Sequence, residues 1–193
     1  MNDLVTGADG LPRCVWGAST PDYAAYHDEE WGRPVRGDDA LYERITLEAF
    51  QSGLSWLTIL RKRPAFRRAF DGFRIATVAG YDEADVARLL GDAGIVRNRA
   101  KIEAAIGNAR AALDLPGGLT ELLWSFAPPP RATRFDRFVD LPATTPESTA
   151  LARALKGHGF RFVGPTTAYA LMQATGMVDD HLAGCHVVVP RPA

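Results

Sequence analysis

GDAGIVRNRAKI, from Gly91 to Ile102, is the stretch that decides the fold, because it places a glycine-rich turn between two segments with helical spacing. Asp82 can cap the helix that leads into the turn. After the turn, apolar side chains recur at helical spacing as far as Leu113. We therefore expect a helix, a hairpin turn and a second helix over residues 82–114.

The rest of the chain also has helical spacing, with little strict alternation of apolar and polar residues. Asp38 and Asp39 can cap a helix that continues to about Ser52. A second helix is expected from Ser55 to Arg63, where Pro64 interrupts it. A last helical region covers residues 147–177, after an extended connection that begins at a run of three prolines. The sequence predicts an all-α protein.

Length and composition favour one compact domain. At 193 residues and 47% hydrophobic content, the chain can bury a core of its own. It begins without a secretion signal, and no apolar stretch approaches the roughly 20 residues of a bilayer span. We expect a cytoplasmic monomer with no membrane segment. It is divided into a flexible extension at residues 1–12, a single domain at 13–186 and a tail at 187–193.

Basic residues are concentrated in the middle of a chain whose net charge is −1. Residues 51–110 hold 11 of the 22 Lys and Arg side chains. Gly94 permits a tight turn, and the following helix can offer free backbone N–H groups to a phosphate. Arg97, Arg99 and Lys101 would add electrostatic attraction. The alternative is that these charges form a solvated helix face.

Two cysteines and two histidines lie in pairs near the two ends of the chain. Cys14 and His27 form one pair, and His181 and Cys185 form the other, at a spacing that puts both on one side of a helical turn. If the ends meet, the four side chains can hold one structural zinc ion with no open position for water. His186 could compete as a ligand. The alternatives are two buried thiols with ordinary histidines, or a disulfide, which a reducing cytoplasm disfavours.

Aromatic residues gather around a glutamate. Glu48 lies on a helix whose two faces both carry apolar residues, so its carboxylate needs a partner. Arg44, one turn earlier, could be an ordinary salt-bridge partner, or Glu48 could line a cavity for a cationic ligand rich in N–H donors, such as an N-alkylated purine. Flat rings can stack on a base held outside the duplex, although core packing is the commoner role of such residues. The rings near Glu48 in the sequence are Trp16, Tyr23, Tyr26, Trp31 and Trp56.

Taken together, these motifs resemble the bacterial 3-methyladenine DNA glycosylase I family of the helix-hairpin-helix glycosylase superfamily. The resemblance spans residues 13–186. The stretches that carry it include RCVW (13–16), YAAYHDEEWG (23–32), LEAFQSGLSW (47–56), DAGIVRNRAKI (92–102) and MQATGMVDDHLAGC (172–185).

The resemblance implies a role for each candidate residue. It implies zinc on the two Cys/His pairs and places Glu48 in the base pocket, where it accepts hydrogen bonds from methylated adenine. Leu54 would fill the gap left by the extruded nucleotide. Trp56 and Tyr26 would stack on the base, Tyr23 would lie beside them, and Trp16 and Trp31 would be neighbouring walls. Phe50, Ala100 and His186 depart from the family pattern.

The implied activity is excision of 3-methyladenine from alkylated double-stranded DNA by hydrolysis of the N-glycosidic bond. Free 3-methyladenine and an abasic site are the products. No lysine nucleophile is evident, so strand cleavage is not expected. Two alternatives stay open: a non-catalytic DNA-binding module that senses alkylated bases, and a hydrolase that uses a metal with an open coordination position.

Overall fold

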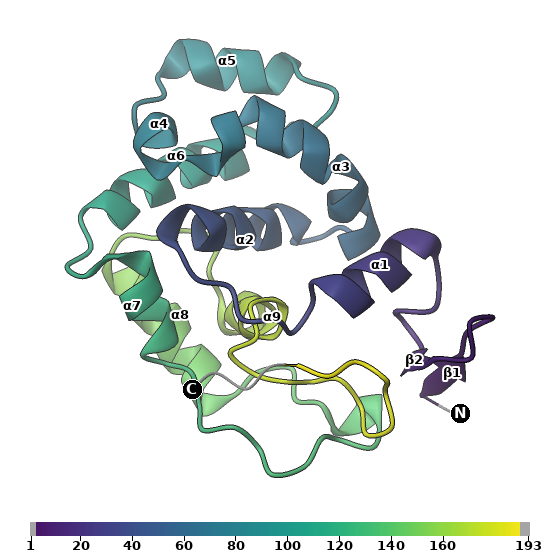
Figure 1. Ribbon diagram of the computed structural model, residues 1–193. Helices are drawn as coiled ribbons and strands as arrows, with labels where there is room; N and C mark the ends of the chain where they lie inside the picture. The colour runs from purple at the N-terminus through teal and green to yellow at the C-terminus, as the bar shows by residue number, and fades with distance from the viewer. Residues whose placement is uncertain (1–2, 190–193) are drawn as a thin grey trace.

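The computed structural model describes residues 3–189 and is mostly helical (Figure 1). Two short strands, β1 (Leu4–Thr6) and β2 (Pro12–Cys14), precede the helices. No helix among the described residues is long and apolar enough to cross a bilayer. The α-helices are α1 (Pro21–Glu29), α2 (Asp38–Gln51), α3 (Trp56–Ala69), α4 (Ile75–Ala79), α5 (Glu83–Gly91), α6 (Arg99–Leu113), α7 (Gly118–Trp124), α8 (Pro146–Gly157) and α9 (Pro165–Ala174). The 3-10 turns are η1 (Asp71–Phe73) and η2 (Phe138–Asp140).

Helix α2 is the central element. It lies between the group of α3 to α6 and the group of α7 to α9 (Figure 1), and it contacts α3, α6, α7 and α9. Residues 45–50 are all buried, on both faces of the helix. The sequence pattern predicted burial of both faces, and the structure confirms it. A charged side chain at position 48 is therefore enclosed whichever way it points.

The predicted helix, turn and helix over residues 82–114 is present as α5 and α6. Asp82 caps α5 in a capping box, and the Asn98 side chain caps α6 by accepting a hydrogen bond from the Lys101 amide. The Lys62 ammonium donates to the carbonyl oxygens of Ala93 and Gly94, at 3.0 and 3.1 Å. The Lys62 side chain of α3 thus fixes the turn between α5 and α6.

Three expected helix boundaries differ from those observed. Helix α3 continues through Pro64, because Phe66 and Ala69 beyond it are buried in the core. The last helical region is two helices, since Gly159 takes a φ of +88° after α8. Gly37, rather than Asp38 or Asp39, is the N-cap of α2. The two carboxylates instead accept hydrogen bonds from other elements: Asp38 from Thr120, and Asp39 from the Ile75 amide.

Within residues 3–189, the two ends of the chain pack together. The described part of the expected extension (residues 1–12) forms, together with Arg13 and Cys14, an antiparallel hairpin in which Leu4 of β1 pairs with Cys14 of β2. Leu4 also packs against a second, small core that contains Leu182, Cys185 and Val187. Of the predicted tail, residues 190–193 lie outside the described part of the chain.

Candidate active site

A cavity of about 380 Å³ lies where α1, α2, α3 and α9 meet. It contains Glu48 and all five of the aromatic residues that the sequence singled out. Its lining residues are Trp16, Tyr23, Tyr26, Trp31, Glu48, Gln51, Trp56, Phe138, Leu141, Ala170 and Gln173. The predicted aromatic cleft with a carboxylate inside it is therefore present.

Glu48 is buried in this cavity without a partner. The residue is 5% exposed, and no hydrogen bond from the described residues reaches its carboxylate. Burial raises the pKa of Glu48 to about 8, and the positive charge of Arg44 opposes only part of that rise. A cation that carries N–H donors would supply what the carboxylate lacks.

The nearby positive charges are committed to a different carboxylate. Glu30 at the end of α1 accepts a hydrogen bond from Arg44 at 3.0 Å and two from Arg63 at 2.6 Å. Burial acts to raise the pKa of Glu30, but the two guanidinium groups lower it to about 2. Arg44 is thus not the ordinary partner of Glu48 that the sequence allowed. The sequence analysis did not identify this network.

The aromatic rings form the walls of the cavity from three segments. Tyr26 and Trp56 lie 5.4 Å apart between ring centroids. Trp16 meets Tyr23 edge to face at 5.7 Å, and Trp31 at 5.0 Å. The Tyr23 hydroxyl accepts a hydrogen bond of 3.0 Å from the amide of Leu57, the second residue of α3. This contact ties α1 to α3 across the cavity.

Burial also raises the pKa of the Tyr26 hydroxyl, and the neighbouring Glu48 adds to the effect. Tyr26 therefore stays neutral and presents a ring rather than a charge to a ligand. Trp56 has a buried Nε1–H group without a hydrogen-bond partner among the described residues. The cavity thus combines flat apolar surfaces with an unpaired acceptor and an unpaired donor.

Five lining residues were not among the candidates from the sequence: Gln51, Phe138, Leu141, Ala170 and Gln173. Gln173 belongs to a stretch that carried the family resemblance, and its amide donates to Asp180 at 2.7 Å. Phe138 and Leu141 come from the extended connection, which has no helical or strand periodicity. No signal in the sequence links that connection to the cavity.

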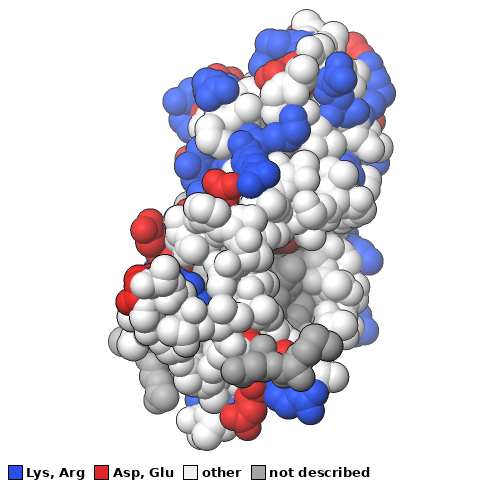
Figure 2. Space-filling view, turned by 90° about the vertical axis from the view of Figure 1, so that its right-hand side faces the viewer, with Lys and Arg blue, Asp and Glu red and all other residues white. Residues whose placement is uncertain are grey.

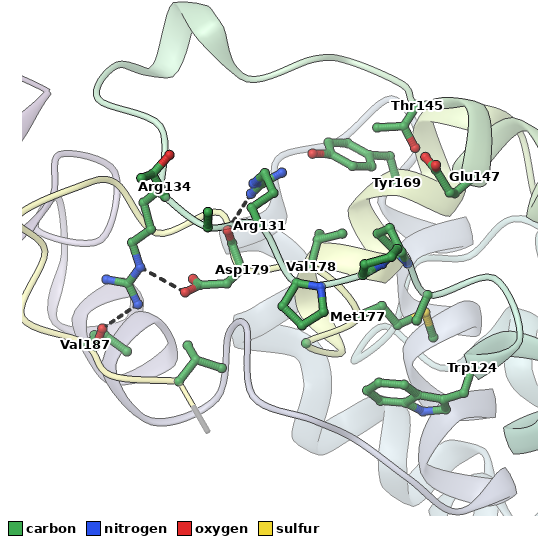
Figure 3. Close-up of a pocket in the computed structure, with 18 of the residues that line it drawn as sticks. Trp124, Arg131, Arg134, Thr145, Glu147, Tyr169, Met177, Val178, Asp179 and Val187 are labelled. Carbon is green, nitrogen blue, oxygen red and sulfur yellow. Dashed lines mark hydrogen bonds and ion pairs between the residues drawn. The ribbon is translucent and has the colours of Figure 1, made fainter. Parts of the chain in front are cut away.

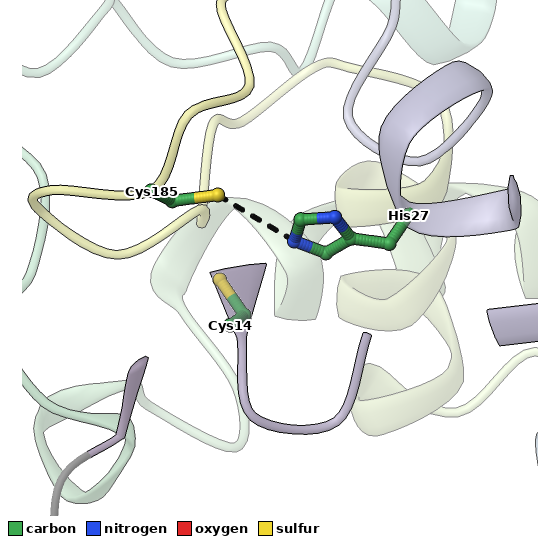
Figure 4. A group of neighbouring side chains, drawn as sticks. All are labelled: Cys14, His27 and Cys185. Atoms are coloured by element: carbon green, nitrogen blue, oxygen red, sulfur yellow. Dashed lines mark hydrogen bonds between the residues drawn. The ribbon is translucent and has the colours of Figure 1, made fainter. Parts of the chain in front are cut away.

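The two ends of the chain meet at a Cys/His cluster. Ligand atoms of Cys14, His27 and Cys185 lie within 4.8 Å of one another, and all three residues are buried (Figure 4). The Cys185 sulfur is 3.6 Å from Nε2 of His27. Because the two thiols share a hydrogen bond, the pKa of Cys185 is lowered and that of Cys14 is raised. Two sulfurs and an imidazole in a buried cluster are a donor set that suits zinc.

The fourth predicted ligand, His181, lies beside this cluster but is not grouped with it. Its ring is buried, 4.9 Å from the ring of His27 between centroids. Its Nδ1 faces Asp179 at 3.0 Å, and its Nε2 lies 3.5 Å from the His27 carbonyl oxygen. His186 belongs to a second possible group, with His27 and Asp28. The structure thus brings three of the four predicted ligands together and leaves both histidines close to them.

The residues proposed for DNA contact lie at two places: the turn between α2 and α3, and the turn before α6 with the start of that helix. Leu54 is 41% exposed on the turn between α2 and α3. Gly94 lies in the turn before α6, and Arg97 is exposed there. Arg99 is exposed but forms ion pairs with Glu83 and Glu103. Lys and Arg side chains gather on the upper half of the face in Figure 2, at the height of α3 and α5 in Figure 1.

Lys101 has a role different from the predicted phosphate contact. It is buried, and its ammonium donates to the carbonyl oxygens of Phe50 and Ser52, at 2.9 and 2.6 Å. Burial lowers its pKa. Lys101 therefore fixes the end of α2 and the start of the turn that carries Leu54.

A larger cavity of about 730 Å³ lies beneath the extended connection (Figure 3). Its charged groups are largely paired. Arg131 contacts Asp180, and Arg134 donates to Asp179 at 2.9 Å and to the Val187 carbonyl oxygen at 2.8 Å. Among residues 3–189, no buried polar side-chain atom in its lining lacks a hydrogen-bond partner, whereas the cavity around Glu48 contains the unpartnered Nε1–H of Trp56.

Comparison with known proteins gives matches over most of the chain. Residues 16–188 match the family described as methyladenine glycosylase. The chain is 46% identical to DNA-3-methyladenine glycosylase 1 of Escherichia coli K12 over 179 residues, which are 91% of this chain and 96% of that protein.

Solved structures give the same result. A crystal structure of 3-methyladenine DNA glycosylase I superimposes with a TM-score of 0.86 at 46% identity, covering 90% of this chain and 98% of the other. A variant of such an enzyme in complex with 3-methyladenine superimposes with a TM-score of 0.85 at 34% identity, covering 90% and 96%.

Proposed function

Because the chain belongs to the methyladenine glycosylase family, we propose that it is a monofunctional DNA glycosylase that excises 3-methyladenine from alkylated duplex DNA. The reaction is hydrolysis of the N-glycosidic bond, and it leaves an abasic site. We expect it to act as a monomer in the cytoplasm, as the first step of base excision repair.

Glu48 is the residue that selects the damaged base in this proposal. Methylation at N3 makes adenine a cation with N–H donors, whereas normal adenine is neutral. A buried carboxylate without another partner gains both charge attraction and hydrogen bonds from the cationic base. Entry of the cation favours the ionised carboxylate, so Glu48 gives up its proton as the base binds.

The chemistry needs little acid catalysis, because the base is already positively charged. The bond between the sugar and the base breaks, its electron pair neutralises the base, and an oxocarbenium-like sugar forms. Water then adds to the sugar and loses a proton. Tyr26 and Trp56 stack on the flipped base, with Tyr23, Trp16 and Trp31 as walls, and each stacked ring contributes about 1 to 3 kcal/mol.

DNA is held without reading its sequence. Leu54 fills the space left by the flipped nucleotide, and the α6 N-terminus with Gly94 and Arg97 contacts backbone phosphate. Arg99 adds positive charge on the same surface. Lys101 supports the Leu54 turn from beneath.

Zinc has a structural role in this proposal. Cys14, His27 and Cys185 would hold the ion with His181, and the ion would tie the N-terminal hairpin to the end of the chain. His27 is adjacent to Asp28, which accepts from Arg13 and from the His27 ring. These contacts orient the ligand. A site with four protein ligands leaves no position for catalytic water.

The unpaired Glu48 carboxylate inside an aromatic cavity is the observation that carries the proposal. The test is chromatography of bases released from methylated duplex DNA. Wild-type protein should release free 3-methyladenine, and Glu48→Gln, which keeps the shape of the side chain, should lose most of that release. Glu147→Gln is the matched control, since Glu147 lines the larger cavity, and it should act like wild type.

Base release, measured together with DNA binding and after chelation, also separates the non-catalytic sensor and the metal-dependent hydrolase from the proposed function. Binding of methylated DNA without release of base would favour the non-catalytic sensor. If chelation abolished base release while the fold stayed intact, a catalytic metal would be favoured. Equal activity of wild type and Glu48→Gln would remove the basis of the proposal.

A further inference from the structure

We propose that the N-terminal hairpin, through Asp3, positions the outer wall of the base cavity, and that this wall limits the size of the N3-alkyl group accepted. The inference rests on the proposed function for its substrate, but the positioning by Asp3 can be tested without substrate. The wall consists of Phe138, the first residue of the 3-10 turn η2, and Leu141, the residue that follows the turn.

The wall is the part of the cavity with the least support of its own. The other aromatic and acidic lining residues come from α1, α2 and α3, from Trp31 just after α1, or from Trp16 between β2 and α1, whereas Phe138 and Leu141 come from the extended connection. Between them, Val139 is 71% exposed and packs against little. Within the turn, the amides of Asp140 and Leu141 bond only to Arg137 and Phe138, at 3.1 Å. Such a segment needs contacts from elsewhere to hold one position.

Asp3 supplies the contact at the wall itself. Its Oδ2 accepts a hydrogen bond of 3.0 Å from the backbone amide of Phe138, across 135 residues of sequence. The other backbone bond to this region joins the Ala183 amide to the Phe135 carbonyl oxygen at 2.8 Å. Asp3 is therefore the anchor closest to the side chains that face the cavity.

Asp3 is held in place by the hairpin. The Val15 amide donates to the Asp3 carbonyl oxygen at 2.9 Å, and β1 begins at the next residue. The Pro12 carbonyl oxygen accepts from the His186 amide at 2.8 Å, which ties β2 to the end of the chain. Leu4, Phe138 and Leu141 pack against the same small core. Hairpin and wall thus form one packed unit.

The anchor lies outside the region shared with the family. The family match begins at residue 16 and the stretches that carry the resemblance begin at Arg13, so Asp3 and β1 precede both. The aromatic and acidic lining residues, from Trp16 to Trp56, fall within the match. Asp3, which precedes the family match, therefore influences a cavity whose lining residues lie within that match. Because Phe138 and Leu141 line the cavity from outside α1, α2, α3 and α9, their position affects the room left for an added alkyl group.

The positioning is tested by hydrogen exchange of the DNA-free protein. Asp3→Ala should increase exchange at residues 135–141 by roughly tenfold or more, because the Phe138 amide loses its acceptor. Asp3→Asn keeps an acceptor oxygen and should exchange nearly as wild type does. Asp136→Ala removes a carboxylate from the same connection that forms no hydrogen bond or ion pair among residues 3–189, and it should have no effect. Unchanged exchange in Asp3→Ala would overturn the anchoring.

The size limit is tested by base release from methylated and ethylated duplex DNA. The quantity measured is the kcat/KM for 3-ethyladenine divided by that for 3-methyladenine. Phe138→Ala should raise this ratio by roughly fivefold or more, since one methylene is worth about tenfold in a fitted pocket. Asp3→Ala should raise it in the same direction, and Asp3→Asn should not. A ratio unchanged in Phe138→Ala would overturn the size limit, whereas absence of any base release by wild type would contradict the proposed function instead.

Discussion

Arg44 lies one helical turn before Glu48 on α2, yet its guanidinium donates to Glu30 at 3.0 Å and leaves the Glu48 carboxylate without a hydrogen bond from the described residues. The other terminal nitrogen of Arg44, Nη1, is buried and has no hydrogen-bond partner among the described residues. Arg44 therefore acts on Glu48 through charge and not through contact. Tyr23 and Tyr26 of α1 line the same cavity as Glu48, and Arg63 of α3 pairs with Glu30.

This relationship predicts the pH dependence of the reaction. Because the pKa of Glu48 is raised to about 8, the ionised fraction in the free protein rises with pH towards that value. The kcat/KM for 3-methyladenine release should rise with it, since this parameter reports ionisations of the free enzyme. Arg44→Met removes the opposing charge and should move the midpoint to higher pH, whereas Arg44→Lys should stay near wild type. An identical midpoint in Arg44→Met would show that the charge has no influence on Glu48.

Stability should depend on pH through the same carboxylate. The folded pKa of about 8 lies above the ordinary value of 4.5, so between these pH values the folded state holds a proton that the unfolded state has lost. The free energy of unfolding should therefore fall as pH rises, by at most about 1.4 kcal/mol per pH unit. Glu48→Gln has no carboxyl group at this position, so its free energy of unfolding lacks this dependence on pH. Its advantage over wild type in urea denaturation should grow between pH 5 and pH 8, and a constant difference would contradict the assignment.

Zinc should be bound with a stoichiometry of one per chain and should stabilise the fold. Removing it with a chelator should lower the melting temperature, because the hairpin and the end of the chain lose their link. His181→Ala should lose the metal on dialysis, and His186→Ala should retain it. The reverse result, measured by elemental analysis, would identify His186 as the ligand and correct the predicted set.

Arg97 and Lys101 should differ in their effect on DNA binding, although both are basic and close in sequence. Arg97→Ala removes an exposed charge, so it should weaken binding to any duplex and reduce the slope of log K against log salt by about 1. Lys101→Ala should instead lower the free energy of unfolding by about 1 to 3 kcal/mol, because the carbonyl oxygens of Phe50 and Ser52 lose their donor. Equal salt slopes for wild type and Arg97→Ala would exclude the phosphate contact.

Leu54 should matter for DNA and not for the free base. Leu54→Ala removes most of an exposed side chain that we propose stabilises the flipped state, so kcat/KM on duplex substrate should fall by roughly tenfold. Binding of free 3-methyladenine, followed by quenching of tryptophan fluorescence, should be unchanged. A loss of free-base affinity would mean that Leu54 belongs to the cavity.

Much of the candidate site could be predicted from sequence because its residues lie in short segments with a regular period. Glu48 and the apolar residues around it fall on one helix, so their burial follows from a 3.6-residue repeat. Tyr23 and Tyr26 are three residues apart on α1 and point into the same cavity. The Cys/His pairs were predicted to meet, and three of the four predicted ligands, Cys14, His27 and Cys185, lie in one cluster. The turn between α5 and α6 was evident from its glycines and caps.

Other features could not be predicted, since they depend on contacts between distant segments. Lys101 and Arg97 have the same character in the sequence, but only the packing of α6 against the end of α2 buries one and exposes the other. Pro64 is a helix breaker by propensity, and burial of Phe66 beyond it lets α3 continue. The N-terminal hairpin packs against a small core to which the two ends of the chain both contribute.

The sequence by itself determined the helical class, the turn between α5 and α6, and which side chains are candidates for the chemistry, because periodicity, caps and residue type are local properties. Only the tertiary structure decided which charges stay unpaired and which segment closes the cavity. Arg44 goes to Glu30 instead of Glu48, and Asp3 reaches Phe138, because side chains far apart in the chain compete for the same partners once the helices pack. That competition is settled by distances in space, which no local pattern in the sequence contains.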